Sequence, residues 1–277
     1  MVSDFRLLLW NIKQQFFVYK NRHQIDAKTG ISDFERRRIS SLERYSSGSS
    51  SLFSKPFLFS RNTSFLHSLD EVFGEEVYRF ETNKENPLII DCGANIGLSV
   101  LYFRRLFPQA KIIAFEPDTE IFEMLSENLS TMDNNELIEL HNEAVWTEDT
   151  ILKFERDGGL AGKLVHENNI NSVSVKAIDF KKYLNQKIDF LKIDIEGAEN
   201  TLIFDIQEHL SNVKLLFLEY HGFTEHEQNL GDILNLLKNK GFHYYIRVAG
   251  ENKVYPFLKY EEENIFDIQL NIFCTRI

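Results

Sequence analysis

Apolar stretches that alternate with helical stretches dominate the chain from Pro87 onward. Seven runs are rich in β-branched and aromatic residues, and stretches with the apolar spacing of a helix separate several of them. Strands that alternate with helices indicate a parallel sheet covered on both faces, so the pattern predicts a Rossmann-like, doubly wound α/β domain. The expected strands are 88–90, 111–115, 138–145, 188–193, 213–218, 242–248 and 268–275, and the expected helices are 97–106, 118–129, 197–204 and 226–240.

Two departures from this alternation predict additions to the sheet. Short β-like runs at 151–154 and 172–175 flank a polar, glycine-containing stretch, which indicates a hairpin-like insertion beside the sheet. The last two expected strands follow one another without a helix between them, around residues 261–264. We therefore expect these two strands to form an antiparallel pair at one edge of the sheet.

Residues 1–80 lack the alternation and are expected to form a helical N-terminal extension, followed by the α/β domain at 81–277. Apolar residues recur at helical spacing from Phe5 to Tyr19, which predicts an amphipathic helix. We expect this helix to pack as a cap on the main domain, and peripheral docking on a membrane or a partner is the alternative. A second helical stretch lies near 31–44. The serine-rich residues 46–54 are expected to form a loop, either a linker or a flexible lid.

The composition argues against a nucleic-acid-binding protein, a membrane-spanning protein and a disulfide-rich or zinc-binding protein. The chain has 277 residues, with 42 acidic and 31 basic side chains and a net charge of -11, which argues against nucleic acid as a partner because phosphate contacts need a positive surface. No stretch approaches the ~20 apolar residues of a membrane span, and no signal peptide is expected. Cys92 and Cys274 lie in strand-like runs and have no zinc or disulfide spacing. These features predict a cytoplasmic protein.

The segment IIDCGANIG, residues 89–97, places small and polar residues between an expected strand and an expected helix. In a doubly wound fold a ligand binds at this carboxyl end of the strands. Gly93 and Gly97 have no Cβ and let the backbone approach a ligand closely, while Asp91 and Asn95 supply polar groups. The amides of the following helix favour an anionic group. The segment predicts a ligand site, although its spacing differs from the dinucleotide pattern GxGxxG.

The next expected strand ends in the acid of IIAFEPD, Glu116, roughly 20 positions beyond the glycine turn. This placement matches an acid that binds both ribose hydroxyls of a nucleoside, with an ordinary solvated acid as the alternative. After the following strand, the backbone of Glu143 to Val145 would then lie beside the base. Trp146 is expected to pack in the core.

Acidic residues and a histidine follow two later strands. In FLKIDIEGAE, Asp194 directly follows a buried strand and needs a polar partner, whereas Glu196 and Glu199 also suit the start of a helix. In LEYH, Glu219 and His221 are two positions apart and share one face if the strand continues. A histidine pKa near 6.5 suits removal of a hydroxyl proton, so His221 is the candidate base.

The histidine and the acidic residues of these two segments also allow a structural role or a metal site. His221 could be a structural histidine, and Asp194 or Glu196 with Glu219 and His221 could bind a divalent ion through oxygen and nitrogen. We expect no metal.

Four segments together resemble the FkbM-type methyltransferases, a branch of the class I fold that depends on S-adenosylmethionine. They are IIDCGANIG, IIAFEPD, LKIDIEGAE and LEYH, and the resemblance covers roughly residues 87–275. It implies a seven-stranded sheet whose last strand is antiparallel, S-adenosylmethionine as methyl donor, and transfer to an oxygen, commonly a hydroxyl on a sugar, a glycan or a natural product. The upstream segment SFLHSLDEVFGEEVYRF resembles a pattern found ahead of the domain in bacterial members. The family resemblance also implies polysaccharide or glycolipid modification as one setting.

The resemblance also implies roles for individual residues. They are Asp91, Gly93, Asn95 and Gly97 for the amino-acid part of the cofactor, Glu116 for its ribose, Glu143 and Ala144 for the adenine, Asp194 for the sulfonium and acceptor with Glu196 and Glu199 nearby, and His221 as base supported by Glu219.

Two other functions compete with methyl transfer. A nucleotide-dependent oxidoreductase also uses a glycine turn followed by an acid, but the turn spacing and the acid-rich DIEGAE segment disfavour it. A catalytically inactive nucleoside-binding scaffold is disfavoured because Asp91, Glu116 and Asp194 are all present. The sequence leaves the acceptor and the oligomeric state open.

Overall fold

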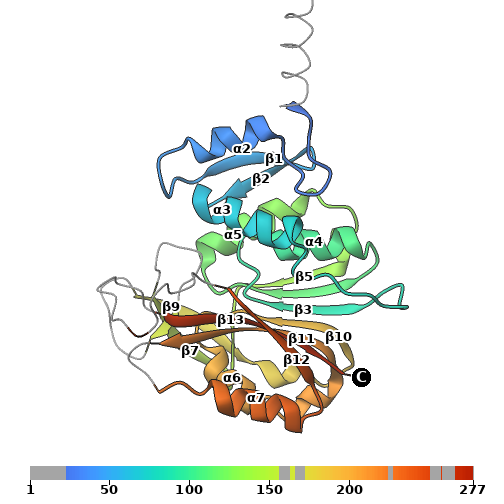
Figure 1. The fold of residues 1–277 in the computed structure, drawn as a ribbon, viewed down its shortest axis with the longest axis vertical. Helices are drawn as coiled ribbons and strands as arrows, with labels where there is room; N and C mark the ends of the chain where they lie inside the picture. The colour runs from blue at the N-terminus through green and yellow to red at the C-terminus, as the bar shows by residue number, and fades with distance from the viewer. Residues whose placement is uncertain are drawn as a thin grey trace, which may run out of the picture. The chain divides into compact units, whose positions relative to one another are not determined.

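The computed structural model describes residues 23–155, 163–165, 172–223, 227–249, 257 and 266–276, in two compact units, Met1–Arg79 and Phe80–Ile277 (Figure 1). The expected amphipathic helix between Phe5 and Tyr19 lies outside the described residues. Within the described part of the chain, no helix is long and apolar enough to cross a membrane.

The second unit is built on a seven-stranded sheet with the order β12-β13-β11-β10-β3-β4-β5. All neighbouring pairs are parallel except those of β13, which runs antiparallel to both β11 and β12. The α/β fold class is therefore confirmed. The strands are β3 (Leu88–Cys92), β4 (Lys111–Phe115), β5 (Ile138–His141), β10 (Ile188–Ile193), β11 (Val213–Phe223), β12 (His243–Val248) and β13 (Phe266–Thr275).

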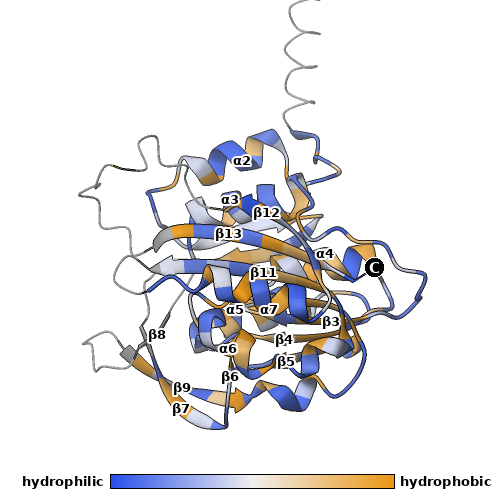
Figure 2. Cartoon of the chain, turned by 60° about the horizontal axis from the view of Figure 1, so that its bottom comes forward, coloured by the Kyte–Doolittle hydropathy of each residue, from blue (hydrophilic) through white to orange (hydrophobic). Residues whose placement is uncertain are grey.

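Helices cover both faces of this sheet, α4 and α5 on one and α6 and α7 on the other (Figure 1). Because both faces are covered, the central strands are mostly apolar, as Figure 2 shows for β3 and β4. Buried charged residues interrupt β3 at Asp91 and β10 at Asp189 and Lys192. Asp118 caps α5 by accepting hydrogen bonds from the amides of Glu120 and Ile121. The helices are α4 (Leu98–Leu106), α5 (Thr119–Ser130), α6 (Glu199–Asp205) and α7 (Leu230–Asn239).

The expected strand 138–145 is in fact two strands in two different sheets. β5 ends at His141, and the side chain of Asn142 then donates hydrogen bonds to the carbonyls of Glu116 and Pro117. These bonds turn the chain out of the large sheet, so that the next strand, β6 (Ala144–Trp146), pairs with β9 (Ser172–Asp179).

The expected insertion is a small second sheet with the order β6-β9-β7-β8. β7 (Thr150–Glu155) pairs with β9 in antiparallel fashion, as a hairpin-like insertion requires, and β8 (Lys163–Val165) pairs with β7. Trp146 packs partly buried against a cluster of Ala144, Val175 and Ala177 in this sheet.

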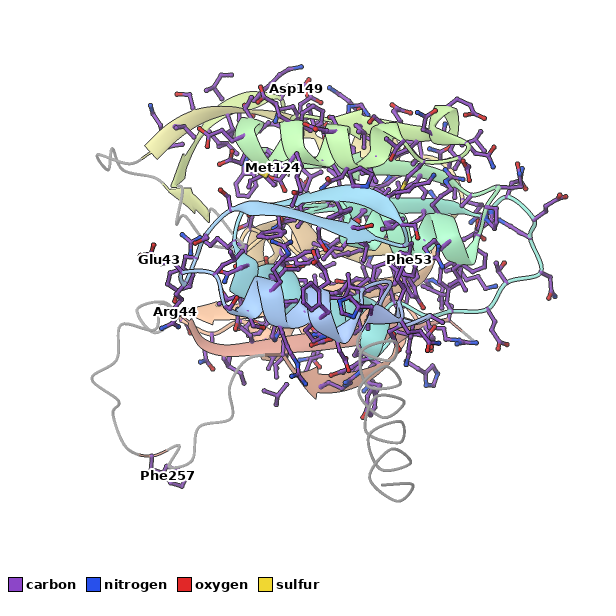
Figure 3. All side chains as sticks on the ribbon, turned by 90° about the horizontal axis from the view of Figure 1, so that it is seen from above. Glu43, Arg44, Phe53, Met124, Asp149 and Phe257 are labelled. Atoms are coloured by element: carbon purple, nitrogen blue, oxygen red, sulfur yellow. The ribbon has the colours of Figure 1, made fainter. Side chains whose placement is uncertain are left out.

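In the first unit, the expectation of a loop at 46–54 is wrong. The serine-rich segment forms β1 (Gly48–Leu52), paired with β2 (Lys55–Phe59), and helices α2 (Asp33–Ser40) and α3 (Asn62–Leu69) flank the hairpin, with a short π-helix η1 (Asp70–Gly74) after α3. The described part of the extension is therefore mixed rather than helical. Figure 3 shows Phe53 at one end of the hairpin and Glu43 and Arg44 at the other.

Tertiary contacts explain why the serine-rich strand is ordered. Ser50 is buried and donates its hydroxyl to Glu35 Oε1 at 2.9 Å. The paired strand supplies Phe59, whose ring stacks on Phe65 at 5.0 Å between centroids. Phe53 and Ser54 both have positive φ, which suits a tight hairpin turn. The aromatic partner strand therefore outweighs the low strand propensity of serine.

Candidate functional site

The glycine turn between β3 and α4 has a backbone conformation that favours glycine at two positions, Gly93 and Gly97. Gly93 has φ +86°, and a Cβ there would lie 1.9 Å from the backbone oxygen of Asp194. Gly97 has φ +97°, and a Cβ there would meet Leu125 Cδ1 at 2.8 Å. Asn95 also has positive φ, and its Oδ1 accepts a hydrogen bond from the Ile96 amide. The turn therefore packs directly against the end of β10.

Asp91 lies beneath this turn and is completely buried. Its Oδ2 accepts a 2.5 Å hydrogen bond from Ser99 Oγ in α4, and its Oδ1 lies 3.2 Å from Lys192 Nζ in β10. The carboxylate therefore ties the turn to its neighbours in this structure, whereas the sequence had suggested direct contact with a ligand.

Glu116 joins the end of β4 to the same turn. Its Oε2 accepts a hydrogen bond from the Asn95 amide at 3.0 Å, and its Oε1 accepts one from the Asp118 amide at 2.9 Å. Burial raises the pKa of Glu116 to about 7, and the two amides only partly oppose that effect. The structure thus brings Glu116 and the turn together, as their spacing predicted.

The expected base-binding region follows β5. The His141 ring stacks on Phe115 at 4.7 Å, and its Nδ1 lies 3.5 Å from Glu143 Oε2. Lys176 forms an ion pair with Glu143. Ala144 is buried in the small sheet, so its backbone is the part that a ligand could contact.

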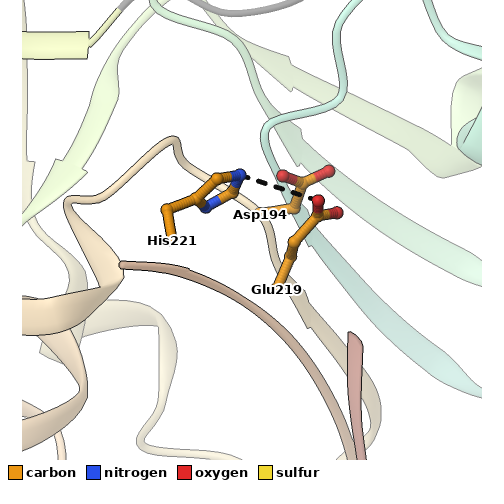
Figure 4. A group of neighbouring side chains, drawn as sticks. All are labelled: Asp194, Glu219 and His221. Atoms are coloured by element: carbon orange, nitrogen blue, oxygen red, sulfur yellow. Dashed lines mark ion pairs between the residues drawn. The ribbon is translucent and has the colours of Figure 1, made fainter. Parts of the chain in front are cut away.

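An acid–histidine cluster, made of Asp194, Glu196, Glu199, Glu219 and His221, lies at the ends of β10 and β11. β11 continues to Phe223, so Glu219 and His221 share one face, as expected. Figure 4 shows Asp194 and Glu219 beside the His221 ring. The sequence therefore predicted this gathering of side chains.

The closest partner of His221 is nevertheless Glu199, not Glu219. Glu199 Oε1 accepts a hydrogen bond from the His221 backbone amide at 2.9 Å and lies 3.0 Å from its Nδ1. His221 Nε2 lies 3.4 Å from Glu196 Oε2 and 3.6 Å from Glu219 Oε1. Glu199 is completely buried and also accepts a hydrogen bond from the Gly197 amide, so it anchors the ring. Glu219, the support that the resemblance implied, lies near the ring as well, and Glu199 is the partner that the sequence analysis did not assign.

These carboxylates change the protonation of His221. Burial lowers the pKa of the imidazole, but the charges of Glu199, Glu196 and Glu219 outweigh burial and raise it to about 10. The pKa therefore lies above the ordinary histidine value near 6.5 that the sequence analysis used, which favours a protonated imidazole at neutral pH. Burial raises the pKa of Glu196 to about 7, although the charge of His221 opposes the rise. The raised pKa makes Glu196 a candidate for proton exchange near neutral pH.

A metal ion is the other group that the cluster could hold. One ligand atom from each of Asp194, Glu219 and His221 lies within 4.8 Å of the others. Two carboxylates and an imidazole suit a divalent cation, but the imidazole must be neutral to bind one. A cation bound there would therefore have to displace the imidazole proton.

The site falls within a recognisable family domain. Residues 91–244, more than half of the chain, match the family model described as the methyltransferase FkbM domain. The chain belongs to the FkbM methyltransferase family. The matched span contains the glycine turn, Glu116 and the whole acid–histidine cluster. The resemblance seen in the sequence is therefore confirmed.

The chain is similar to named methyltransferases of several organisms. The chain is 30% identical over 209 residues to methyltransferase sdnD of Sordaria araneosa, which covers 62% of this chain and 80% of that protein. It is 26% identical over 178 residues to the 2-O-methyltransferase NoeI of Sinorhizobium fredii (strain NBRC 101917 / NGR234), which covers 56% and 72%. The alignment with the crystal structure of methyltransferase FkbM from Methylobacillus flagellatus KT covers 70% of this chain and 45% of that chain, with 15% identity and a TM-score of 0.43.

The sequence analysis of this FkbM domain missed Lys192. The side chain lies among Asp91, Gly93 and Asp194 and is 2% exposed. The available signal was a lysine inside the apolar strand FLKI. A buried charge of that kind needs partners, which the neighbouring strand supplies.

Proposed function

We propose that this FkbM methyltransferase transfers a methyl group from S-adenosylmethionine to a hydroxyl oxygen of a sugar, glycan or natural product. The observation that carries the proposal is the direct packing of the glycine turn on the end of β10, where a Cβ on Gly93 would lie 1.9 Å from the Asp194 oxygen. This packing joins a nucleoside-type turn to the acid–histidine cluster at the carboxyl edge of one sheet. A doubly wound fold binds its ligands at that edge.

The donor groups fit S-adenosylmethionine. No side chain caps the start of α4, so its first amides can bind the carboxylate of the amino-acid part, beside Asn95 and Gly97. Each Glu116 oxygen accepts one hydrogen bond from a backbone amide and can accept a second from a ribose hydroxyl. Glu143 and the backbone of Ala144 are assigned to the adenine. When bound, the cofactor supplies an electrophilic methyl group on a positively charged sulfur.

The protein then has to align the acceptor and receive one proton. The hydroxyl oxygen attacks the methyl carbon as the carbon–sulfur bond breaks, and the hydroxyl proton passes to a carboxylate of the cluster. Glu196 is the proposed proton acceptor, because its pKa of about 7 matches neutral conditions. Asp194 and Glu219 orient the hydroxyl. His221 keeps its own proton and holds the carboxylates in place, so we propose it as a positioning residue.

The negative charge of the acid–histidine cluster limits which groups the acceptor can carry near the reacting hydroxyl. Asp194, Glu196 and Glu219 would repel a phosphate or carboxylate close to the reacting hydroxyl. The acceptor that fits best is therefore neutral around that hydroxyl, and the net charge of -11 likewise disfavours nucleic acid. The relative NoeI is named a 2-O-methyltransferase, which supports an oxygen as the methylated atom. Both cysteines are free and buried, which supports a cytoplasmic setting.

Calorimetric titration and label transfer test the proposal. We expect S-adenosylhomocysteine to bind and NAD not to bind. With labelled S-adenosylmethionine, we expect transfer to a member of a panel of neutral glycosides, glycans and alcohols, and mass spectrometry should place the label on oxygen. Binding of NAD instead would support the oxidoreductase alternative. Cofactor binding without transfer to any hydroxyl compound would support the inactive scaffold.

A further inference from the structure

Lys192 is a buried charged side chain in the described site region to which the proposed chemistry gives no role. Every residue of β10 is buried, and Lys192 is 2% exposed. Lysine is almost never buried to this degree unless its charge is paired, because an ammonium ion loses strong hydration in the interior. An apolar side chain would fill the strand without that cost. The position of Lys192 therefore calls for specific partners.

The partners of Lys192 come from three separate parts of the site. Its Nζ donates a 2.9 Å hydrogen bond to the backbone oxygen of Gly93 in the glycine turn. It lies 3.2 Å from Asp91 Oδ1, directly across the β3–β10 pair, and 3.2 Å from Asp194 Oδ2 at the end of its own strand. The ammonium group therefore donates one hydrogen bond to the turn and has two carboxylates within ion-pair distance.

We infer that Lys192 is a positioning residue that fixes the glycine turn relative to Asp194. One ammonium group joins β3, the turn and the acid–histidine cluster, so it sets the spacing between the cofactor side and the acceptor side. The inference rests on the proposed function, which assigns those two sides. Methyl transfer needs in-line alignment, and a displacement of about 1 Å in such a site can cost roughly a hundredfold in rate.

The shape of the group matters as well as its charge. Arginine spreads its five donors over a planar fork, which cannot direct three donors from one atom to three converging acceptors. Methionine has a similar length and no donor. Lys192→Arg therefore keeps the positive charge but no longer places it on a single nitrogen among the three oxygen atoms. Lys192→Met removes both the charge and the donor.

The experiment compares Lys192→Met and Lys192→Arg with the wild type and with a matched control, Lys187→Met. Lys187 immediately precedes β10 and is exposed at the opposite end of the strand. Calorimetry measures the Kd of S-adenosylhomocysteine below the melting temperature of each variant. We expect both Lys192 variants to bind about 10- to 100-fold more weakly than the wild type, as for the loss of one charge-assisted hydrogen bond. Lys187→Met should bind like the wild type.

Several results would overturn the inference. A Kd of Lys192→Met within twofold of the wild type would make the lysine irrelevant to the turn. Full recovery of affinity in Lys192→Arg would reduce its role to charge balance, which any cation could serve. No binding by the wild type would instead refute the proposed function, so the two failures are distinguishable.

A measurement on the wild type covers the case in which neither Lys192 variant folds. In protein labelled with ¹⁵N at the lysine side chains, a buried and hydrogen-bonded ammonium exchanges its protons slowly and gives a visible signal. We expect such a signal to shift when S-adenosylhomocysteine is added. The absence of any shift at saturating S-adenosylhomocysteine would contradict a link between Lys192 and the cofactor turn.

Discussion

The two sides of the site stabilise their buried acids in different ways. On the cofactor side, backbone amides of Asn95 and Asp118 hold Glu116, so the geometry depends on the path of the chain. On the proposed acceptor side, Glu199 also accepts hydrogen bonds from two backbone amides, those of Gly197 and His221, but in addition it contacts the His221 ring. Glu196 and Glu219 lie near the same ring. We therefore expect a backbone change in the glycine turn to act on the cofactor side, and loss of the His221 ring to act on the acceptor side.

Gly93→Ala should have the largest effect and should fall on the cofactor side. The new Cβ would lie 1.9 Å from the Asp194 oxygen, at φ +86°. Backbone strain and overpacking together predict a loss of about 5 kcal/mol in the free energy of unfolding, measured in urea. We also expect the affinity for S-adenosylhomocysteine to fall by roughly a hundredfold or more.

The matched control is Gly231→Ala in α7, where a Cβ would meet nothing within 4 Å. That variant should be slightly more stable, by about 0.5–1 kcal/mol. Equal effects of the two substitutions would show that the turn has no special constraint.

His221→Ala should break the acceptor side. It removes the cation among three carboxylates and leaves the completely buried Glu199 without its ring partner. We expect a loss of about 3–5 kcal/mol in stability and a fall in turnover by roughly a hundredfold or more, with little change in the Kd of S-adenosylhomocysteine. His243→Ala, at an exposed position on β12, is the control. A parallel loss of cofactor affinity would remove the proposed division between the two sides.

Glu116 provides a test of pH dependence. Its pKa is about 7 in the folded protein, against an ordinary value of 4.5, so the folded state binds this proton more tightly. The carboxyl group therefore favours folding at low pH, and its contribution is lost as the pH rises from about 4.5 to 7. The size of the shift corresponds to roughly 3 kcal/mol.

We expect Glu116→Gln to remove this part of the decline in stability, measured by urea unfolding at several pH values. Glu127→Gln, at an exposed position of α5, should keep the wild-type slope. The same slope in all three proteins would mean that Glu116 does not titrate in this range.

Glu219→Gln should have the smallest effect on stability. Its Oε1 lies 3.6 Å from His221 Nε2, and the side chain is 16% exposed, whereas Glu199 is completely buried. We expect a change below about 1 kcal/mol for Glu219→Gln and roughly 3 kcal/mol for Glu199→Gln, measured by thermal unfolding. The reverse order would restore Glu219 as the main partner of the ring.

The sequence predicted the parts that follow from strand periodicity and strand ends. Asp91, Glu116, Asp194 and His221 all end or follow apolar runs, and parallel strands bring such ends to one edge of a sheet. The position of a residue at the end of an apolar run can be read from the sequence alone, so the sequence is enough to predict that these residues lie together.

Other features depend on contacts between distant segments. The role of Lys192 follows from its register opposite Asp91, which no local pattern fixes. The pKa of His221 follows from burial among three carboxylates, two of which lie on another segment. The serine-rich β1 is ordered by packing around Phe59 and Phe65, not by its own propensity. These properties required the three-dimensional arrangement.

We propose that the glycine turn and the acid–histidine cluster form one site for methyl transfer to oxygen. The most direct test incubates the wild type and Gly93→Ala with methyl-labelled S-adenosylmethionine and the panel of neutral hydroxyl compounds. We predict that the wild type forms a labelled ether and an equal amount of S-adenosylhomocysteine, and that Gly93→Ala forms neither. Saturation of the wild type with cofactor but no label on any oxygen would contradict the claim.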